Sequence, residues 1–165
     1  TVSACGKLYR RSILEIPFPK GRIYEDLYII SEHVEKANKI VHTSIQIYNY
    51  YKRQGSIVNS KFTSKQYDFF DAINHNRGII KGKYNDKKSL ESAVNAKEVM
   101  GSFKIIGSAY KTSITDVYKI RKIIKRNYTN ILSNSKINFF VKMKFTLFIL
   151  SPNLFNVIKR LIVKK

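Results

Sequence analysis

Hydrophobic residues recur at helical spacing over most of the chain. After Asp26 the apolar positions lie three or four residues apart, while glutamate and lysine occupy the other face, which predicts an amphipathic helix. Its apolar face consists of Leu27, Ile30, Val34, Ala37 and Val41. Further helices are predicted over residues 65–77 and 90–110, behind the candidate N-caps Ser64 and Ser89. Another opens at Thr115-Asp116, with an apolar stripe of Val117, Ile120, Ile124, Tyr128 and Ile131.

Two segments have the pattern of strands. Residues 4–9 read as a short strand, and residues 45–51 are rich in β-branched and aromatic side chains. Between them, Pro17, Pro19 and Gly21 predict an extended loop, because proline restricts both its own backbone and that of the preceding residue.

The last thirty residues differ from the rest. Residues 137–150 are dominated by aromatic and bulky apolar side chains, and Ser151-Pro152 has the N-cap and first-turn signature of another helix. That helix is both apolar and basic, so residues 136–165 are predicted to form a basic amphipathic tail.

Charge is unevenly distributed along the 165 residues. The formal net charge is +20, yet no Asp or Glu follows Asp116, whereas 12 Lys or Arg do. A content of 44% hydrophobic residues predicts a globular fold with a real core rather than a disordered basic chain.

Several site classes are excluded by residue counts and spacing. Cys5 is the single cysteine and cannot form an internal disulfide. His33, His42 and His75 have no ligand-like spacing, which argues against a zinc site and a Cys/His nucleophile pair. No apolar run approaches the ~20 residues that a spanning helix requires, so no transmembrane helix is predicted.

Three blocks carry a resemblance to a known family. They are Gly6-Lys7-Leu8-Tyr9-Arg10-Arg11, then Phe18-Pro19-Lys20-Gly21-Arg22-Ile23-Tyr24-Glu25-Asp26, then Tyr48-Asn49-Tyr50-Tyr51-Lys52-Arg53-Gln54-Gly55-Ser56-Ile57. In this order the blocks resemble the acceptor-side, C-terminal part of bacterial family-2 glycosyltransferases, over about residues 1–60.

The resemblance implies an α/β fold class: an acceptor-side part of a GT-A fold with few strands, followed by a helical C-terminal region. It divides the chain into residues 1–60 of the catalytic domain, a helical extension over 61–135 and the tail over 136–165. It also implies inverting sugar transfer, with an N-terminal nucleotide-binding half expected upstream. In that upstream half an Asp-x-Asp pair would hold Mg²⁺ or Mn²⁺. In this chain Asp68 and Asp71 are spaced Asp-x-x-Asp instead. No metal ligands and no activity are therefore expected of this chain alone.

By the resemblance, Asp26 is the catalytic base and Glu25 its neighbour at the acceptor. The physical chemistry agrees, since a carboxylate in the first turn of a helix is kept in place and ionised by backbone N–H groups. The alternative is that the Glu25-Asp26 pair only caps the helix.

Three further residues are candidates for substrate contact. Arg53 suits the leaving diphosphate, because guanidinium offers a planar fork to phosphate oxygens, or else it is a solvated turn residue. Lys7 is assigned to donor phosphate or acceptor, with a surface role as the alternative. Tyr50 shares a predicted strand face with Tyr48, and both could pack in the core instead.

The expected partners are a nucleotide-sugar donor and a glycan or lipid-linked acceptor. Residues 137–165 are predicted to bind an anionic membrane surface, which would place the protein in the cytoplasm at the inner face of the plasma membrane. The alternative is that they pack on the catalytic domain or on a second copy in a homo-oligomer. A rival function is nucleic-acid binding through the basic patch at Lys119–Arg126, although no known RNA- or DNA-binding signature accompanies it.

Overall fold

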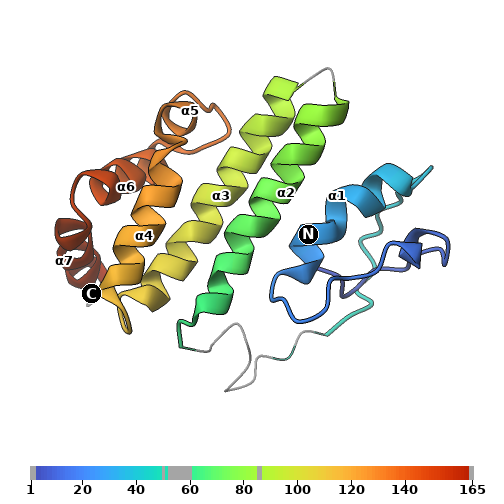
Figure 1. Cartoon of the computed structure of the whole chain (residues 1–165), viewed down its shortest axis with the longest axis horizontal. Coiled ribbons are helices and arrows are strands. Elements are labelled where there is room, and N and C mark those ends of the chain that lie inside the picture. The colour runs from blue at the N-terminus through green and yellow to red at the C-terminus, as the bar shows by residue number, and fades with distance from the viewer. Residues whose placement is uncertain (1–2, 50, 52–60, 85–86, 164–165) are drawn as a thin grey trace. The chain divides into compact units, whose positions relative to one another are not determined.

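The computed structural model describes residues 3–49, 51, 61–84 and 87–163, and every regular element in these ranges is a helix (Figure 1). The chain divides into two compact units, which are described separately. Unit 1 comprises Thr1–Ser60 and Ser64–Lys83, and unit 2 comprises Lys61–Thr63 and Tyr84–Lys165. The division of the sequence at residues 60 and 135 stays a prediction.

Unit 1 is built on two packed helices, α1 (Glu25–Lys36) and α2 (Asp68–Lys83). Two short 3₁₀ turns, η1 (Ile13–Glu15) and η3 (Ser64–Tyr67), accompany them. The predicted helix after residue 26 is confirmed, but it ends at Lys36 and leaves Val41 outside. Buried apolar residues of the pair are Leu27, Ile29, Phe69, Phe70, Ala72, Ile73 and Ile80.

Unit 2 is a helical bundle of α3 (Lys87–Ala109), α4 (Ile114–Lys125), α5 (Tyr128–Leu132), α6 (Phe139–Leu150) and α7 (Pro152–Val163). Helix α3 packs against α4 and α5, while α4 also packs against α6 and α7 (Figure 1). The stripe predicted in α4 forms much of the core, since Val117, Ile120 and Ile124 are fully buried. From the other helices the core takes Val99, Ile105, Ile106, Ile131, Phe145, Phe148 and Phe155.

Local signals at the helix starts in unit 2 are confirmed in part. Pro152 begins α7, and the Ser151 hydroxyl accepts a hydrogen bond from the Leu154 N–H at 3.2 Å. Helix α4 begins at Ile114, one residue before the predicted Thr115, and Ser113 is its N-cap, whose hydroxyl accepts from the Asp116 N–H.

The predicted α/β fold class is wrong. Residues 4–9 form turns and coil, and no strand occurs in the described part of 45–51 or anywhere else among the described residues. Ile45 and Ile47 have the side chains of a strand but are 72% and 61% exposed. A strand needs a neighbour to accept and donate its ladder hydrogen bonds, and no residue that the structure describes forms a strand beside Ile45 and Ile47.

Within the described ranges, no helix is both long enough and apolar enough to cross a bilayer.

Candidate functional site

Asp26 is presented by a sharp turn into helix α1. Tyr24, the N-cap, adopts a left-handed backbone with φ of 62°, which is uncommon for a residue with a large side chain. Asp26 is the second residue of the helix, and its Oδ1 accepts a hydrogen bond from the Leu27 N–H at 2.6 Å. Its side chain is half-buried, so the carboxylate is held locally without being sealed from solvent.

The loop that delivers Asp26 is tied to the start of α2. The carboxylate of Asp68 accepts from the Ile23 N–H at 3.0 Å, and Asp71 pairs with Arg22 at 3.2 Å. The Tyr24 ring meets the buried ring of Phe69 edge-on, with 5.4 Å between centroids. The Asp-x-x-Asp pair therefore anchors the loop at residues 22 and 23.

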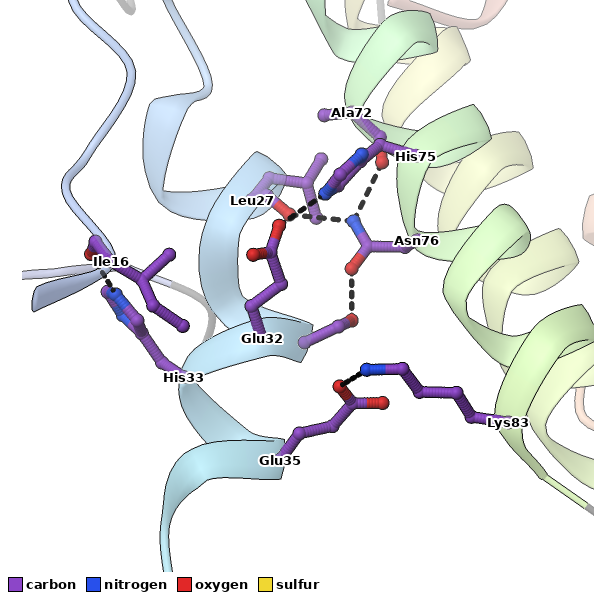
Figure 2. A network of polar contacts seen from close by, with 10 residues as sticks. Ile16, Leu27, Glu32, His33, Glu35, Ala72, His75, Asn76 and Lys83 are labelled. Carbon is purple, nitrogen blue, oxygen red and sulfur yellow. Dashed lines mark hydrogen bonds and ion pairs between the residues drawn. The ribbon is translucent and has the colours of Figure 1, made fainter. Parts of the chain in front are cut away.

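A polar network holds α1 against α2 (Figure 2). Asn76, which is buried, donates through its side-chain amide to the carbonyl of Leu27 at 2.8 Å and to that of Ala72 at 2.7 Å. The Ser31 hydroxyl donates to the Asn76 amide oxygen. Because Leu27 directly follows Asp26, Asn76 positions the first turn of α1 as well as joining the helices.

Two ion pairs extend this network along the helices (Figure 2). His75 Nε2 lies 2.6 Å from a Glu32 carboxylate oxygen, and Lys83 Nζ lies 2.6 Å from Glu35. The His75 ring also stacks on the Tyr28 ring, with 4.0 Å between centroids. The Arg22 guanidinium lies 4.7 Å from the centroid of the same Tyr28 ring.

An aromatic cluster lies on the other side of α1. Tyr9, Phe18 and the buried His33 contact one another edge-on, with centroid separations of 6.4, 5.4 and 5.2 Å. His33 Nε2 lies 2.9 Å from the Ile16 carbonyl oxygen, whereas its buried Nδ1 has no hydrogen-bond partner. His33 thus joins the loop around Phe18 to the helix that carries Asp26.

Asp26 is electrostatically coupled to two tyrosines. Burial, and then the negative charge of Asp26, raises the pKa of Tyr9 above its ordinary value, and the same two causes raise the pKa of Tyr24. Both phenols keep their protons at neutral pH, as an ordinary tyrosine does, and are able to donate hydrogen bonds.

Described members of the three sequence blocks lie close together in unit 1. Tyr9 of the first block contacts Phe18 of the second, and a Cβ added at Gly6 would lie 3.6 Å from the Cβ of Tyr48 in the third. Gly6 has φ of 69°, so a side chain there would be strained in any case. Tyr48 is 53% exposed and does not pack in a core.

The remaining candidate residues have different outcomes. Lys7 is half-buried, and its ammonium group donates to the Ser3 carbonyl. Glu25 is half-buried as the first residue of α1. Tyr50 and Arg53 lie outside the described residues, so their roles stay predictions.

Sequence reasoning missed several residues that build this site. His33 was read only as a histidine without metal-ligand spacing, and Asn76 was not singled out. An asparagine and a histidine on apolar helix faces are signals of buried hydrogen bonding, but nothing in their spacing names the partner.

No group of three or more His, Cys, Asp and Glu side chains within the described ranges is arranged to hold a metal ion. The divalent metal implied by the resemblance has no fitting ligand set there. Comparison of the chain with protein-family models, with curated proteins and with solved structures finds no match.

Proposed function

We propose that this chain supplies the acceptor side of an inverting glycosyltransferase in which Asp26 is the general base. One observation supports this above the others: described members of three separate sequence blocks lie together in unit 1, and Asp26 is close enough to Tyr9 to affect its pKa. The order and residue types of the blocks resemble family-2 glycosyltransferases.

The chemistry assigned to Asp26 is a single proton transfer coupled to substitution. One carboxylate oxygen accepts the proton of an acceptor hydroxyl, and that hydroxyl oxygen bonds to the anomeric carbon of the donor sugar. The bond from this carbon to the nucleoside diphosphate breaks, and the diphosphate leaves with the bonding electrons. Attack opposite the leaving group inverts the anomeric configuration, so the base must stand on the acceptor side.

The surroundings of Asp26 suit such a base. The half-buried carboxylate is held by the helix start, by the anchored loop before it and by Asn76 behind it. A base fixed in this way loses little freedom when the acceptor binds. The protonated phenols of Tyr9 and Tyr24 are suitable donors to acceptor hydroxyls, and Glu25 is the suitable neighbouring acceptor of hydrogen bonds.

The test is sugar transfer by the full-length enzyme that the resemblance implies, comparing wild type with Asp26→Asn. Removal of a general base is expected to lower kcat on the order of 10²- to 10⁴-fold. Binding of the nucleotide sugar, measured by calorimetry, is expected to stay unchanged. Glu15→Gln is the matched control, because Glu15 is a 71% exposed carboxylate of the same unit that pairs with Lys36. Full turnover of Asp26→Asn would end the proposal.

Nucleic-acid binding is the rival function, and its support is charge alone. Lys122, Lys125 and Arg126 are exposed on and after α4, while Lys119 pairs with Asp116 at 3.4 Å. Filter binding of random-sequence RNA over a range of salt concentrations tests it. Tight, salt-dependent binding with no sugar transfer by the full-length enzyme would favour the rival.

A further inference from the structure

Helix α6 is apolar on two opposite faces. Phe145, Phe148 and Ile149 face the core of unit 2 and are buried. On the opposite face, by helical geometry, lie Phe139, Phe140, Met143 and Leu150, of which Phe139 is 69%, Phe140 68% and Leu150 72% exposed. The second face is not needed to fill the core and remains in contact with solvent.

Helix α7 continues this exposed apolar surface. Phe155 is buried, whereas Leu154, Val157 and Leu161 form a stripe at helical spacing and are 50%, 54% and 66% exposed. Leu150 ends α6, Leu154 lies in the first turn of α7, and the two helices pack against each other. Phe139, Phe140, Met143, Leu150, Leu154, Val157 and Leu161 are together called the α6–α7 apolar surface.

Cationic side chains of α6 and α7 border this surface. Lys142 is three residues after Phe139, Lys144 is four residues after Phe140, and Arg160 is three residues after Val157, which places each beside the stripe on its helix. Neither helix contains an Asp or Glu. Long basic side chains of this kind can keep their charge in water or against phosphate while their stems cover apolar surface.

We infer that the α6–α7 apolar surface docks on the surface of an anionic lipid bilayer, lying in the interface without crossing it. Large contiguous exposed apolar surfaces on a folded protein mark interaction sites, and a basic border selects for a negatively charged partner. A second copy of this chain would bring the same cations face to face, so the charge pattern opposes a symmetric dimer through this surface. A bilayer of anionic lipids satisfies both the apolar and the charged groups.

Co-sedimentation of the full chain with vesicles tests the inference. Binding is expected to vesicles of phosphatidylcholine mixed with phosphatidylglycerol, and to be much weaker with phosphatidylcholine alone. The double variant Phe139→Ser, Leu150→Ser should reduce partitioning on the order of tenfold, because two large apolar side chains no longer insert. Its matched control is Met100→Ser, Ile114→Ser, which removes two exposed apolar residues of α3 and α4 that are not members of this surface and should bind as wild type.

The charge contribution is measured with a second pair of variants. Lys144→Gln, Arg160→Gln should reduce binding to anionic vesicles about fivefold per charge removed. Lys97→Gln, Lys104→Gln removes the same charge from the exposed side of α3 and should change binding much less. Equal losses in both pairs would mean attraction by net charge alone and would overturn the docking surface.

Two further outcomes would also overturn it. One is wild-type vesicle binding by Phe139→Ser, Leu150→Ser and by the single variant Leu161→Ser. The other is self-association of the wild type in sedimentation velocity that the serine variants abolish, without vesicle binding, which would identify a second copy as the occupant. Circular dichroism confirms that each variant is folded, and the assay needs no sugar transfer, so its failure leaves the role of Asp26 untouched.

Discussion

The interactions that stabilise the interior of each compact unit differ between the two units. In unit 2 the core is mostly apolar, with Val99, Ile120, Phe145 and Phe148 fully buried, although Asn95, Glu98, Ser102 and Asn134 are buried among the apolar residues. In unit 1 the helices α1 and α2 are joined by a smaller set of apolar residues and by polar bonds between residues more than forty positions apart. Unit 2 also has long-range polar bonds, such as that from the Asn134 amide to the Ser92 carbonyl at 2.6 Å, but polar residues make up a larger share of the buried residues in unit 1.

Apolar burial and polar bonds contribute differently to stability and to the positioning of a catalytic group. The free energy of apolar burial is non-directional and grows with the buried area, so it stabilises a bundle without fixing the orientation of single side chains. Hydrogen bonds and ion pairs fix orientation, which a catalytic carboxylate requires, although each contributes little net free energy. The candidate base Asp26 lies in unit 1, where hydrogen bonds and ion pairs fix how α1 and α2 are oriented.

The largest expected stability effect is in the core of unit 2. Phe148→Ala removes a fully buried ring that also packs edge-on against Phe155 at 5.4 Å. The variant should lower the free energy of unfolding by about 3–5 kcal/mol, from lost transfer free energy and the cavity that remains. Native-state hydrogen exchange, read on peptides of α3, α4, α6 and α7, measures this loss.

The same experiment tests whether the units are energetically separate. Peptides of α1 and α2 should keep most of their protection in Phe148→Ala, and the exposed control Leu132→Ala should change neither unit appreciably. An equal loss of protection in both units would show that they unfold together and would remove the basis of the comparison.

A smaller effect is expected from the polar core of unit 1. Asn76→Ala removes the amide that donates to the Leu27 and Ala72 carbonyls and accepts from Ser31. The expected loss is about 1–3 kcal/mol, read from hydrogen exchange in α1 and α2. Asn74→Ala, on the exposed side of the same helix, is the control and should cost much less.

Asn76→Ala also tests the link between orientation and chemistry. In the full-length enzyme it should lower sugar transfer more than the control does, while thermal unfolding of unit 2 stays the same. A variant that is destabilised in α1 but transfers sugar at the wild-type rate would show that Asn76 does not position Asp26.

The smallest expected effect appears only in alkali. Burial, and then the charge of Tyr118, raises the pKa of Tyr110 to about 12. The folded protein then retains a proton that the unfolded chain, with an ordinary tyrosine pKa of about 10, has already lost. Stability contributed by Tyr110 is therefore complete below about pH 10 and declines as the pH rises toward 12.

Tyr110→Phe separates this titration from the hydrogen bond of the phenol. At neutral pH the variant loses the bond to the Pro152 carbonyl, which is 2.5 Å long, and about 1 kcal/mol of stability. Between pH 10 and 12 its unfolding free energy should fall less steeply than that of wild type. Urea unfolding at several pH values measures both slopes, with Tyr51→Phe, which is 74% exposed in wild type, as the control. Parallel slopes for wild type and Tyr110→Phe would contradict the assignment.

Sequence patterns predicted unit 2 better than unit 1. The stripe of Val117, Ile120 and Ile124 is the core face of α4, and Ser151-Pro152 opens α7. In α1 the helix was predicted correctly but its buried face was not, because Val34 is 45% exposed and His33 is buried in its place. Polar packing of His33 with Tyr9 and Phe18 overrides the simple apolar pattern there.

The sequence by itself determined that α1, α3, α4 and α7 are helices, since helical periodicity and caps involve residues no more than four positions apart. It also determined the basic, apolar character of α6 and α7. Only the tertiary structure decided that Ile45 and Ile47 lie exposed without a strand partner, that Asp68 anchors the loop at Ile23, and that Asn76 binds behind Asp26. Such contacts join residues distant in the chain, and no local spacing encodes which partners will meet.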